Sequence, residues 1–207
     1  MNSIILNTAY LPPIAYYKSL LNATSVLIEH CEYFQKQTYR NRCNIYGANG
    51  ILNLSIPIQK RGVKTLTKDV KISYADNWQK LHWRSLQSAY RSSPFFEFYE
   101  DDFVAFYESK KHIFLIDFNA AILATTLKLL DKSIEFKNTT SYYKKYDEGV
   151  NDHRNYNFQK LTPSDSNTFV KPYIQVFENK HGFIPNLSIV DVLFNQGAMT
   201  TDSIKNL

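Results

Sequence analysis

The sequence predicts an α/β fold, in which an N-terminal strand–helix–strand unit and a β-hairpin form a mixed sheet and the second half is rich in helices. Two short apolar runs, Ile4–Leu6 and Ser25–Glu29, flank a segment with helical spacing. Residues 51–59 alternate between apolar and polar side chains, as a half-buried strand does. From Asn77 onward the apolar residues recur at helical spacing instead.

The N-terminal unit begins with Ile4–Leu6, which is compatible with a buried strand. Proline lacks an N–H group and suits the first turn of a helix, so Pro12 and Pro13 predict a helix over Pro13–Asn22. Ser25–Glu29 is the second strand. The short connections favour a parallel strand pair with a right-handed crossover.

A polar, cationic segment, Tyr33–Arg42, follows this unit and contains no acidic residue. As a strand, its period of two places Lys36, Arg40 and Arg42 on one face; as a helix, Lys36 and Arg40 still share a face. Burial of such a run is costly unless its charges are paired. The segment therefore binds an anionic ligand, pairs with acids elsewhere in the fold, or lies solvated on the surface.

The next elements are a hairpin and a short strand. Cys43–Tyr46 and Ile51–Gln59 are expected to pair around a four-residue loop, Gly47–Gly50. The basic loop Lys60–Lys64 follows, and Asp69–Ser73 is predicted to be a further strand.

Four helices are expected in the remainder. The first begins near Asn77, with Asp76 and Gln79 as a capping box. The second begins with Ser93 as N-cap and Pro94 at the first helical position. Its aromatic stripe, which we expect to be core, comprises Phe95, Phe96, Tyr99, Phe103, Phe106 and Tyr107. The third helix is predicted over Asp117–Leu130, and the last runs from Ser188 as N-cap to Phe194, with Gly197 beyond it and a frayed tail.

The chain of 207 residues is expected to form a single domain. Its parts are a sheet-rich region (1–75), a helical region (76–131), an irregular region (132–172) and a C-terminal helix with its tail (173–207). Ser133–Lys137 is a candidate strand, and Tyr173–Glu178 is either strand or helix. Tyr142–Gln159 is polar and rich in tyrosine, so a long loop is predicted there.

Composition excludes several classes of function. Neither GxGxxG nor GxxxxGK[ST] is present, so no dinucleotide or P-loop site and no cofactor are expected. Two cysteines, Cys31 and Cys43, form no zinc-binding pattern, and no metal site is predicted. The N-terminus does not have the pattern of a signal peptide, and no apolar run approaches membrane-spanning length. We therefore expect a cytoplasmic protein with reduced thiols and no membrane partner.

The net charge of +5 leaves an anionic partner open. Lysine and arginine are scattered along the chain rather than massed in blocks, which argues against nucleic acid as that partner.

Four segments, spread in order along nearly the whole chain, carry a resemblance to a known family. They are Tyr10–Pro13 with Tyr16 and Tyr17; Tyr39–Arg42 leading to the hairpin and Ile56–Ile58; the helix Trp78, His82, Ser85 and Tyr90 followed by Ser93–Phe96; and Asn186–Asn195. Together they resemble the WbqC-like family, and the chain is similar to its shorter, Bacteroidetes-type members.

The resemblance implies a transferase that moves an acyl or aminoacyl (glycyl) group to an amino-sugar nucleotide in surface-polysaccharide synthesis. The partner expected from it is an anionic small molecule, a nucleotide or nucleotide-sugar. The candidate substrate-binding residues are Tyr10, Lys36, Tyr39, Arg40, Asn41, Arg42 and Trp78. Guanidinium groups match phosphate geometry, so Arg40 and Arg42 are the predicted phosphate ligands.

His82 is the candidate general base, since histidine titrates near neutral pH. Its place in an apolar stripe fits a hydrogen-bonded core histidine as well. Whether the protein is an enzyme is left open by the sequence. The alternatives are a non-enzymatic module that binds a nucleotide or a protein, and a single-stranded nucleic-acid binder that uses basic and aromatic residues.

Overall fold

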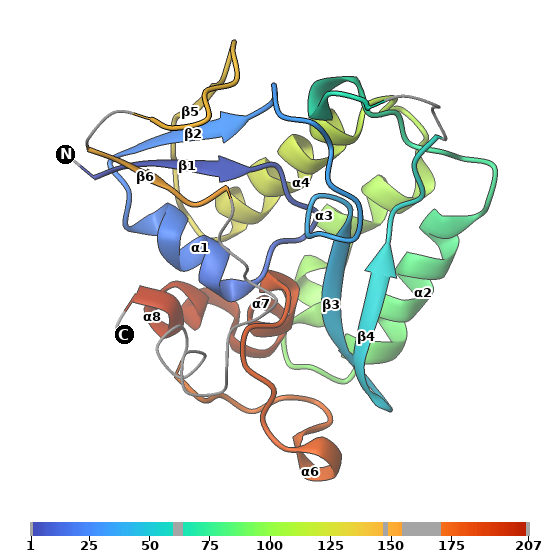
Figure 1. Ribbon diagram of the computed structural model, residues 1–207. Coiled ribbons are helices and arrows are strands. Elements are labelled where there is room, and N and C mark those ends of the chain that lie inside the picture. The colour runs from blue at the N-terminus through green and yellow to red at the C-terminus, as the bar shows by residue number, and fades with distance from the viewer. Residues whose placement is uncertain (1, 60–63, 147–148, 155–170, 206–207) are drawn as a thin grey trace.

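A computed structural model describes residues 2–59, 64–146, 149–154 and 171–205. It contains a parallel sheet, a separate hairpin, and helices concentrated in the second half of the chain (Figure 1). The predicted α/β class and the helix-rich second half are confirmed. Within the described residues, no helix has both the length and the apolar composition that a bilayer crossing requires.

The parallel sheet has four strands in the order β5-β2-β1-β6. β1 (Ser3–Asn7) and β2 (Ser25–Glu29) lie side by side, joined by α1 (Ile14–Leu21), which confirms the predicted N-terminal unit. Alternate residues Ile4, Leu6, Val26 and Ile28 join the main hydrophobic core. Short outer strands flank the pair, namely β5 (Phe136–Asn138) on β2 and β6 (Val150–Asp152) on β1.

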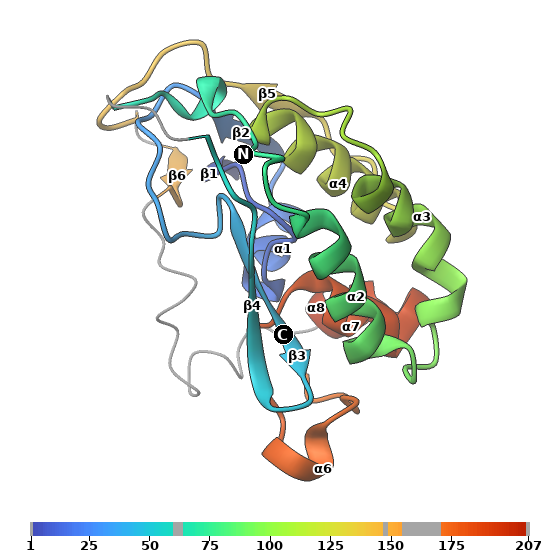
Figure 2. The same cartoon turned by 90° about the vertical axis from the view of Figure 1, so that its right-hand side faces the viewer.

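The hairpin consists of β3 (Arg42–Gly47) and β4 (Gly50–Ser55) and forms a two-stranded sheet of its own. Gly47 pairs with Gly50, so the loop has two residues rather than the predicted four. Gly50 has φ of +98°, a conformation that glycine adopts without steric strain. The hairpin lies on one side of the molecule, and α2, α3 and α4 lie on the other (Figure 2).

The three central helices are α2 (Trp78–Tyr90), α3 (Phe96–Glu108) and α4 (Leu115–Leu129). The predicted capping box at the start of α2 is wrong, because Gln79 is buried and donates hydrogen bonds to the carbonyls of Phe106 and Ser109 instead. Ser93 is likewise not the N-cap of α3; its hydroxyl donates to the carbonyl of Tyr90, and α3 begins at Phe96. The aromatic stripe on α3 is core, as predicted, apart from the partly exposed Phe95.

The C-terminal region carries more structure than the sequence indicates. α6 (Glu178–His181) precedes α7 (Ile189–Gln196), which begins after Ser188 as predicted and ends just before Gly197. The predicted frayed tail is wrong, because η2 (Gly197–Met199) and α8 (Thr200–Lys205) follow. Ile204 anchors this end of the chain, since its side chain is fully buried in the core.

The structure also differs from the sequence prediction at Asp69–Ser73 and in the segment Tyr142–Gln159. Asp69–Ser73 is not a strand; a 3-10 turn, η1 (Thr67–Asp69), is followed by isolated bridges at Lys71 and Ile72. The expected long loop Tyr142–Gln159 contains β6, and its residues beyond 154 lie outside the described part of the chain.

Candidate functional site

A pocket of about 560 Å³ lies between the cationic segment, the base of the hairpin and the stretch that ends at Val70. We name it the hairpin pocket. Its apolar lining comes from Phe34, Ile56, Pro57, Ile58 and Val70. Its volume falls within the range of small-molecule sites, about 300–1,000 Å³.

The polar lining of the hairpin pocket is cationic. Lys36, Arg42 and Lys64 are among the lining residues, together with the amides Gln37, Asn41 and Gln59, and none of the described lining residues is acidic. Lys36, Asn41 and Arg42 belong to the segment that the sequence singles out. Lys64 belongs to the basic loop and was not predicted as a site residue, although its place in a short, basic, glycine-containing loop was the available signal.

Arg42 lies within the lining and has no hydrogen-bond or ion-pair partner among the described residues. It is half-buried, its Nε atom is inaccessible to solvent, and its side chain makes no hydrogen bond or ion pair in the described part of the chain. The adjacent Asn41 is 7% exposed and donates from Nδ2 to the carbonyl of Ile56, whereas its Oδ1 has no partner among described groups. Unpaired buried polar atoms are uncommon and call for a ligand or water.

Arg40, the other predicted phosphate ligand, is engaged elsewhere. Its guanidinium lies against the carboxylate of Glu32, with Nε–Oε1 at 2.7 Å and Nη2–Oε2 at 2.8 Å, and both residues are buried. Arg40 does not line the hairpin pocket. For this residue the structure shows pairing with an acid, one of the uses that the sequence left open.

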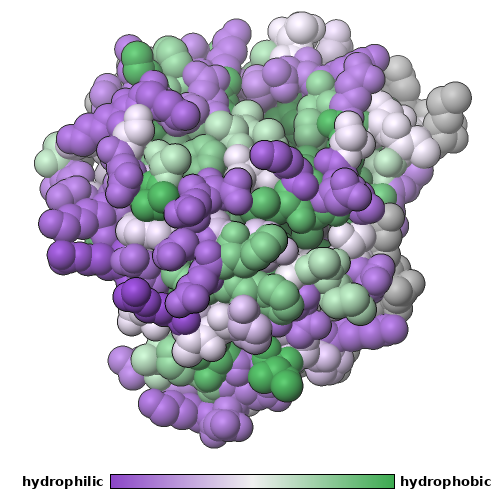
Figure 3. Space-filling view, turned by 180° about the vertical axis from the view of Figure 1, so that it is seen from behind, coloured by the Kyte–Doolittle hydropathy of each residue, from purple (hydrophilic) through white to green (hydrophobic). Residues whose placement is uncertain are grey.

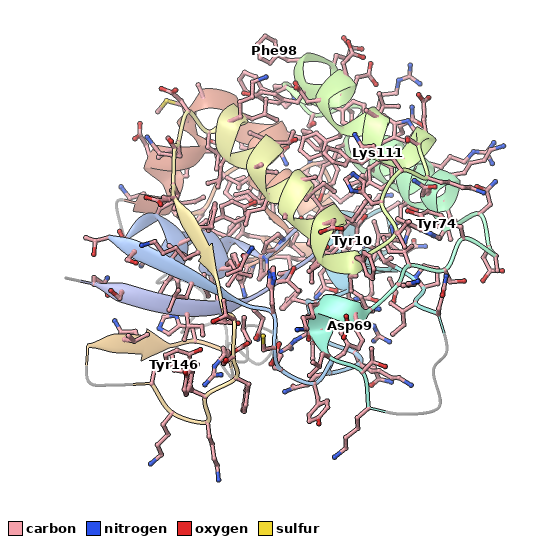
Figure 4. The ribbon with its side chains drawn as sticks, turned by 90° about the horizontal axis from the view of Figure 1, so that it is seen from above. Tyr10, Asp69, Tyr74, Phe98, Lys111 and Tyr146 are labelled. Atoms are coloured by element: carbon pink, nitrogen blue, oxygen red, sulfur yellow. The ribbon has the colours of Figure 1, made fainter. Side chains whose placement is uncertain are left out.

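Tyr10, which Figure 4 labels, lies in the core beside His82, and neither residue lines the hairpin pocket. The Tyr10 hydroxyl is 3.0 Å from His82 Nδ1 and 2.8 Å from the Tyr107 hydroxyl. Burial lowers the pKa of His82 to about 4, against a hydrogen bond with the Ser55 backbone that raises it. His82 is therefore neutral at pH 7 and bridges α2 to the end of β4.

Trp78 and Tyr39 complete the predicted set, and neither lines the hairpin pocket. Trp78 is 4% exposed and packs edge-on against His82, with ring centroids 5.0 Å apart. Burial raises the pKa of Tyr39 to about 12, and a hydrogen bond with Asn44 opposes the shift. The structure thus brings Lys36, Asn41 and Arg42 together and places Tyr10, Trp78 and His82 in a separate aromatic cluster.

A second charged cluster, missed by the sequence analysis, lies at the carboxyl edge of the parallel sheet. Glu29 ends β2, is fully buried, and accepts a hydrogen bond from Arg154 Nη1 at 2.9 Å. Arg154 also pairs with Asp152, which ends β6. The rings of Tyr142 and Tyr146 lie 5.1 and 4.9 Å from the Arg154 guanidinium, and Figure 4 shows Tyr146 beside β6.

The cluster at the sheet edge is a closed structural network, because the contacts of Arg154 with Asp152, Glu29 and the carbonyl of Tyr143 engage all of its guanidinium nitrogens.

No group of three or more potential metal ligands occurs among the described residues. Neither cysteine is in a disulfide: Cys43 is buried, which raises its pKa, and Cys31 is partly exposed.

Comparison with known proteins identifies the family of the chain. The chain is 23% identical to the uncharacterized protein Rv1507c of Mycobacterium tuberculosis, over 97% of this chain and 96% of that protein. No solved structure matches the chain significantly. The sequence profile of the WbqC-like protein family matches residues 8–165, which include every predicted site residue. The chain therefore belongs to the WbqC-like protein family.

Proposed function

We propose that the protein binds a phosphate-bearing small molecule, a nucleotide or nucleotide-sugar, in the hairpin pocket. The observation that carries the proposal is the guanidinium of Arg42, which no described residue pairs, set in a lining with two lysines and no acid among its described members. A guanidinium in this position recognises phosphate oxygens through two parallel hydrogen bonds. The apolar residues of the pocket, such as Phe34 and Ile56, suit a base or sugar ring.

The reaction that we propose for this ligand is the one implied by the family resemblance, acyl or aminoacyl (glycyl) transfer to an amino-sugar nucleotide in surface-polysaccharide synthesis. Arg42 and Lys36 would hold the diphosphate of the acceptor. The Asn41 side chain would accept a hydrogen bond from the ligand at Oδ1.

His82 has a positioning role in this proposal. The prediction that it takes a proton from the amine stays a prediction, but a side chain 2% exposed and hydrogen-bonded to Tyr10 is poorly placed to meet the acceptor. Through its hydrogen bond with the Ser55 backbone, His82 instead holds the end of β4, and Ser55 lines the hairpin pocket.

Thermal unfolding with UDP, UDP-, dTDP- and GDP-sugars and pyrophosphate tests the binding step. A ligand at a hundred times its dissociation constant raises the free energy of unfolding by about 2.7 kcal/mol, a midpoint shift of about 5–10 °C for a chain of this size. If no compound in this panel moves the midpoint, the proposal fails.

Arg42→Ala should weaken binding of the best compound about tenfold or more, because a hydrogen bond to a charged group contributes about 1.5–3 kcal/mol. Arg91→Ala is the matched control, since Arg91 is exposed at the end of α2 and does not line the pocket. Equal affinities of the two variants would remove Arg42 from the site.

The alternatives are separated by two further measurements. Mass spectrometry of an amino-sugar nucleotide incubated with the protein and aminoacyl donors detects the added acyl mass, and its absence with intact binding favours a non-enzymatic module. Oligonucleotide binding whose affinity falls steeply with salt concentration would instead favour the hypothesis of a single-stranded nucleic-acid binder.

A further inference from the structure

A second, smaller pocket of about 190 Å³ lies where α4 meets the carboxyl ends of β1, β2 and β5. We name it the α4 pocket. Thr8 and His30 directly follow β1 and β2, and Asn138 ends β5. Ligands of open parallel sheets bind at the carboxyl ends of the strands, so the α4 pocket occupies a favoured position.

The size of the α4 pocket suits one ring. An apolar cavity of about 150 Å³ is large enough to take up benzene. Most of the lining is apolar, including Ala9, Ile28, Leu123 and Phe136. On α4 the exposed residues Ala120 and Ala124 border it with side chains of a single methyl group, which leaves the pocket open to solvent there. Figure 3 views the molecule from behind, where hydrophobic side chains lie among hydrophilic ones.

One buried polar group in the lining has an oxygen that no described residue hydrogen-bonds. Asn119 is 1% exposed, and its Nδ2 donates to the Thr8 hydroxyl at 3.0 Å and to the Arg40 carbonyl at 2.9 Å. These two bonds use both protons of the amide and fix its orientation. The Oδ1 atom accepts no hydrogen bond from the described residues, although buried acceptors are usually satisfied.

The α4 pocket offers no charge to a ligand at neutral pH. The only titratable side chains in its described lining are His30 and Tyr16. Burial lowers the pKa of His30, against the nearby carboxylates of Glu29 and Asp117, which raise it. Burial raises the pKa of Tyr16.

We propose that the α4 pocket binds a single uncharged aromatic ring that carries an O–H or N–H donor for Asn119 Oδ1. This site is separate from the hairpin pocket. The two are joined through one short segment, because Asn119 bonds to the carbonyl of Arg40 while the next two residues, Asn41 and Arg42, line the hairpin pocket.

Phenol and toluene test the proposal, because they are similar in size and only phenol carries a donor. Titration of the ¹⁵N-labelled protein should give saturable phenol shifts at the Asn119 side-chain amide, with an affinity at least tenfold above that for toluene. Equal affinities would overturn the role of Oδ1. If phenol causes no shift at Asn119, the proposed ligand site is refuted. Ordered water would then be the partner of Asn119 Oδ1.

Ala124→Phe should abolish the phenol shifts, because the new ring fills the pocket from its exposed edge. Ala105→Phe, at an exposed position on α3 outside the pocket, is the control for an added surface phenylalanine and should leave the shifts unchanged. Phenol binding that survives both Ala124→Phe and Ala120→Phe would overturn the proposal. Binding of the best nucleotide ligand should be unchanged in Ala124→Phe. The proposals for the α4 pocket and the hairpin pocket are therefore tested independently.

Discussion

Arg40 and Glu32 form a buried, two-pronged ion pair, with both carboxylate oxygens within 2.8 Å of guanidinium nitrogens. The pair joins the segment after β2 to the segment before β3. The carbonyl of Arg40 meanwhile accepts the hydrogen bond from Asn119 of α4. Arg40 therefore positions the backbone from which Asn41 and Arg42 reach the hairpin pocket.

Glu32→Gln should lower the free energy of unfolding by about 3–5 kcal/mol, because it leaves the buried guanidinium of Arg40 without its counter-charge. The double variant Glu32→Leu with Arg40→Met removes both charges and should recover most of that loss. Urea denaturation of the three proteins measures the effect. A loss below about 1 kcal/mol in Glu32→Gln would mean that the pair is effectively solvated.

Protonation of Asp191 should raise the free energy of unfolding as the pH falls. It is fully buried among Tyr90, Tyr173 and Gln175, which donate hydrogen bonds to it at 2.9, 2.5 and 2.8 Å. Burial raises its pKa from 3.8 to about 6 in the folded state, although these hydrogen bonds lower it. The folded state therefore binds the proton more tightly, and the destabilisation by this group decreases as the pH falls from about 6 to 3.8.

Between pH 7.5 and pH 4, titration of Asp191 should change the free energy of unfolding by about 2–3 kcal/mol, since one pKa unit corresponds to about 1.4 kcal/mol. Asp191→Asn removes this titration, so the stability difference between wild type and variant should change with pH over that range. Urea midpoints at several pH values measure it. A difference that is flat with pH would contradict the raised pKa.

Titration of His82 should have the opposite effect and lower the free energy of unfolding as the pH falls. Burial lowers its folded-state pKa from 6.5 to about 4, so the unfolded chain takes up the proton first. Its contribution to stability is complete above pH 6.5 and is lost as the pH falls toward 4. The same urea series on His82→Gln should show less loss of stability between pH 7 and pH 4.5 than wild type shows. An equal loss in both proteins would place the acid sensitivity elsewhere.

Tyr10→Phe should destabilise the fold by about 1–3 kcal/mol, because it removes the hydroxyl between His82 and Tyr107 and leaves both buried groups without that partner. Tyr143→Phe is the control, since its ring is 58% exposed and the change should stay within about 0.5 kcal/mol. Similar values for the two variants would show that the Tyr10 hydroxyl contributes little.

Gly197→Ala should lower stability by at least about 2 kcal/mol, from left-handed backbone strain and overpacking together. Gly197 has φ of +54°, and a Cβ atom there would lie 2.6 Å from the ring of Phe95. In a Phe95→Ala background the same change should cost less, because only the backbone strain remains. Chemical denaturation of the double-mutant cycle separates the two terms, and full additivity would mean that the ring moves aside.

Local patterns in the sequence were enough to predict the strand–helix–strand unit at the N-terminus. The β-branched runs around Ile4 and Val26 and the proline pair before α1 leave few alternatives to a parallel strand–helix–strand unit. The aromatic stripe on α3 and the glycine that ends α7 were predicted for the same reason, since burial and backbone freedom depend on nearby residues. Family membership also followed from motifs in order along the chain.

Hydrogen bonds between distant residues could not be predicted in this way. Gln79 fits a capping box locally, but carbonyls about thirty residues away compete for its amide. Arg154 has one partner nearby, Asp152, but its contact with Glu29 crosses the sheet, and Asp191 accepts a hydrogen bond from Tyr90 of α2. Nothing in the neighbouring sequence indicates these two long-range contacts.

The sequence by itself determined the fold class and the presence of a cationic segment from Lys36 to Arg42. Only the tertiary structure decided which of its charges is paired with an acid among the described residues. Arg40 meets Glu32 because the chain turns back on itself after β2, whereas Arg42 begins β3 and faces a pocket without acids among its described lining. Whether a charged side chain is paired depends on which residues lie beside it in the folded chain. The packing of the whole chain decides which residues those are.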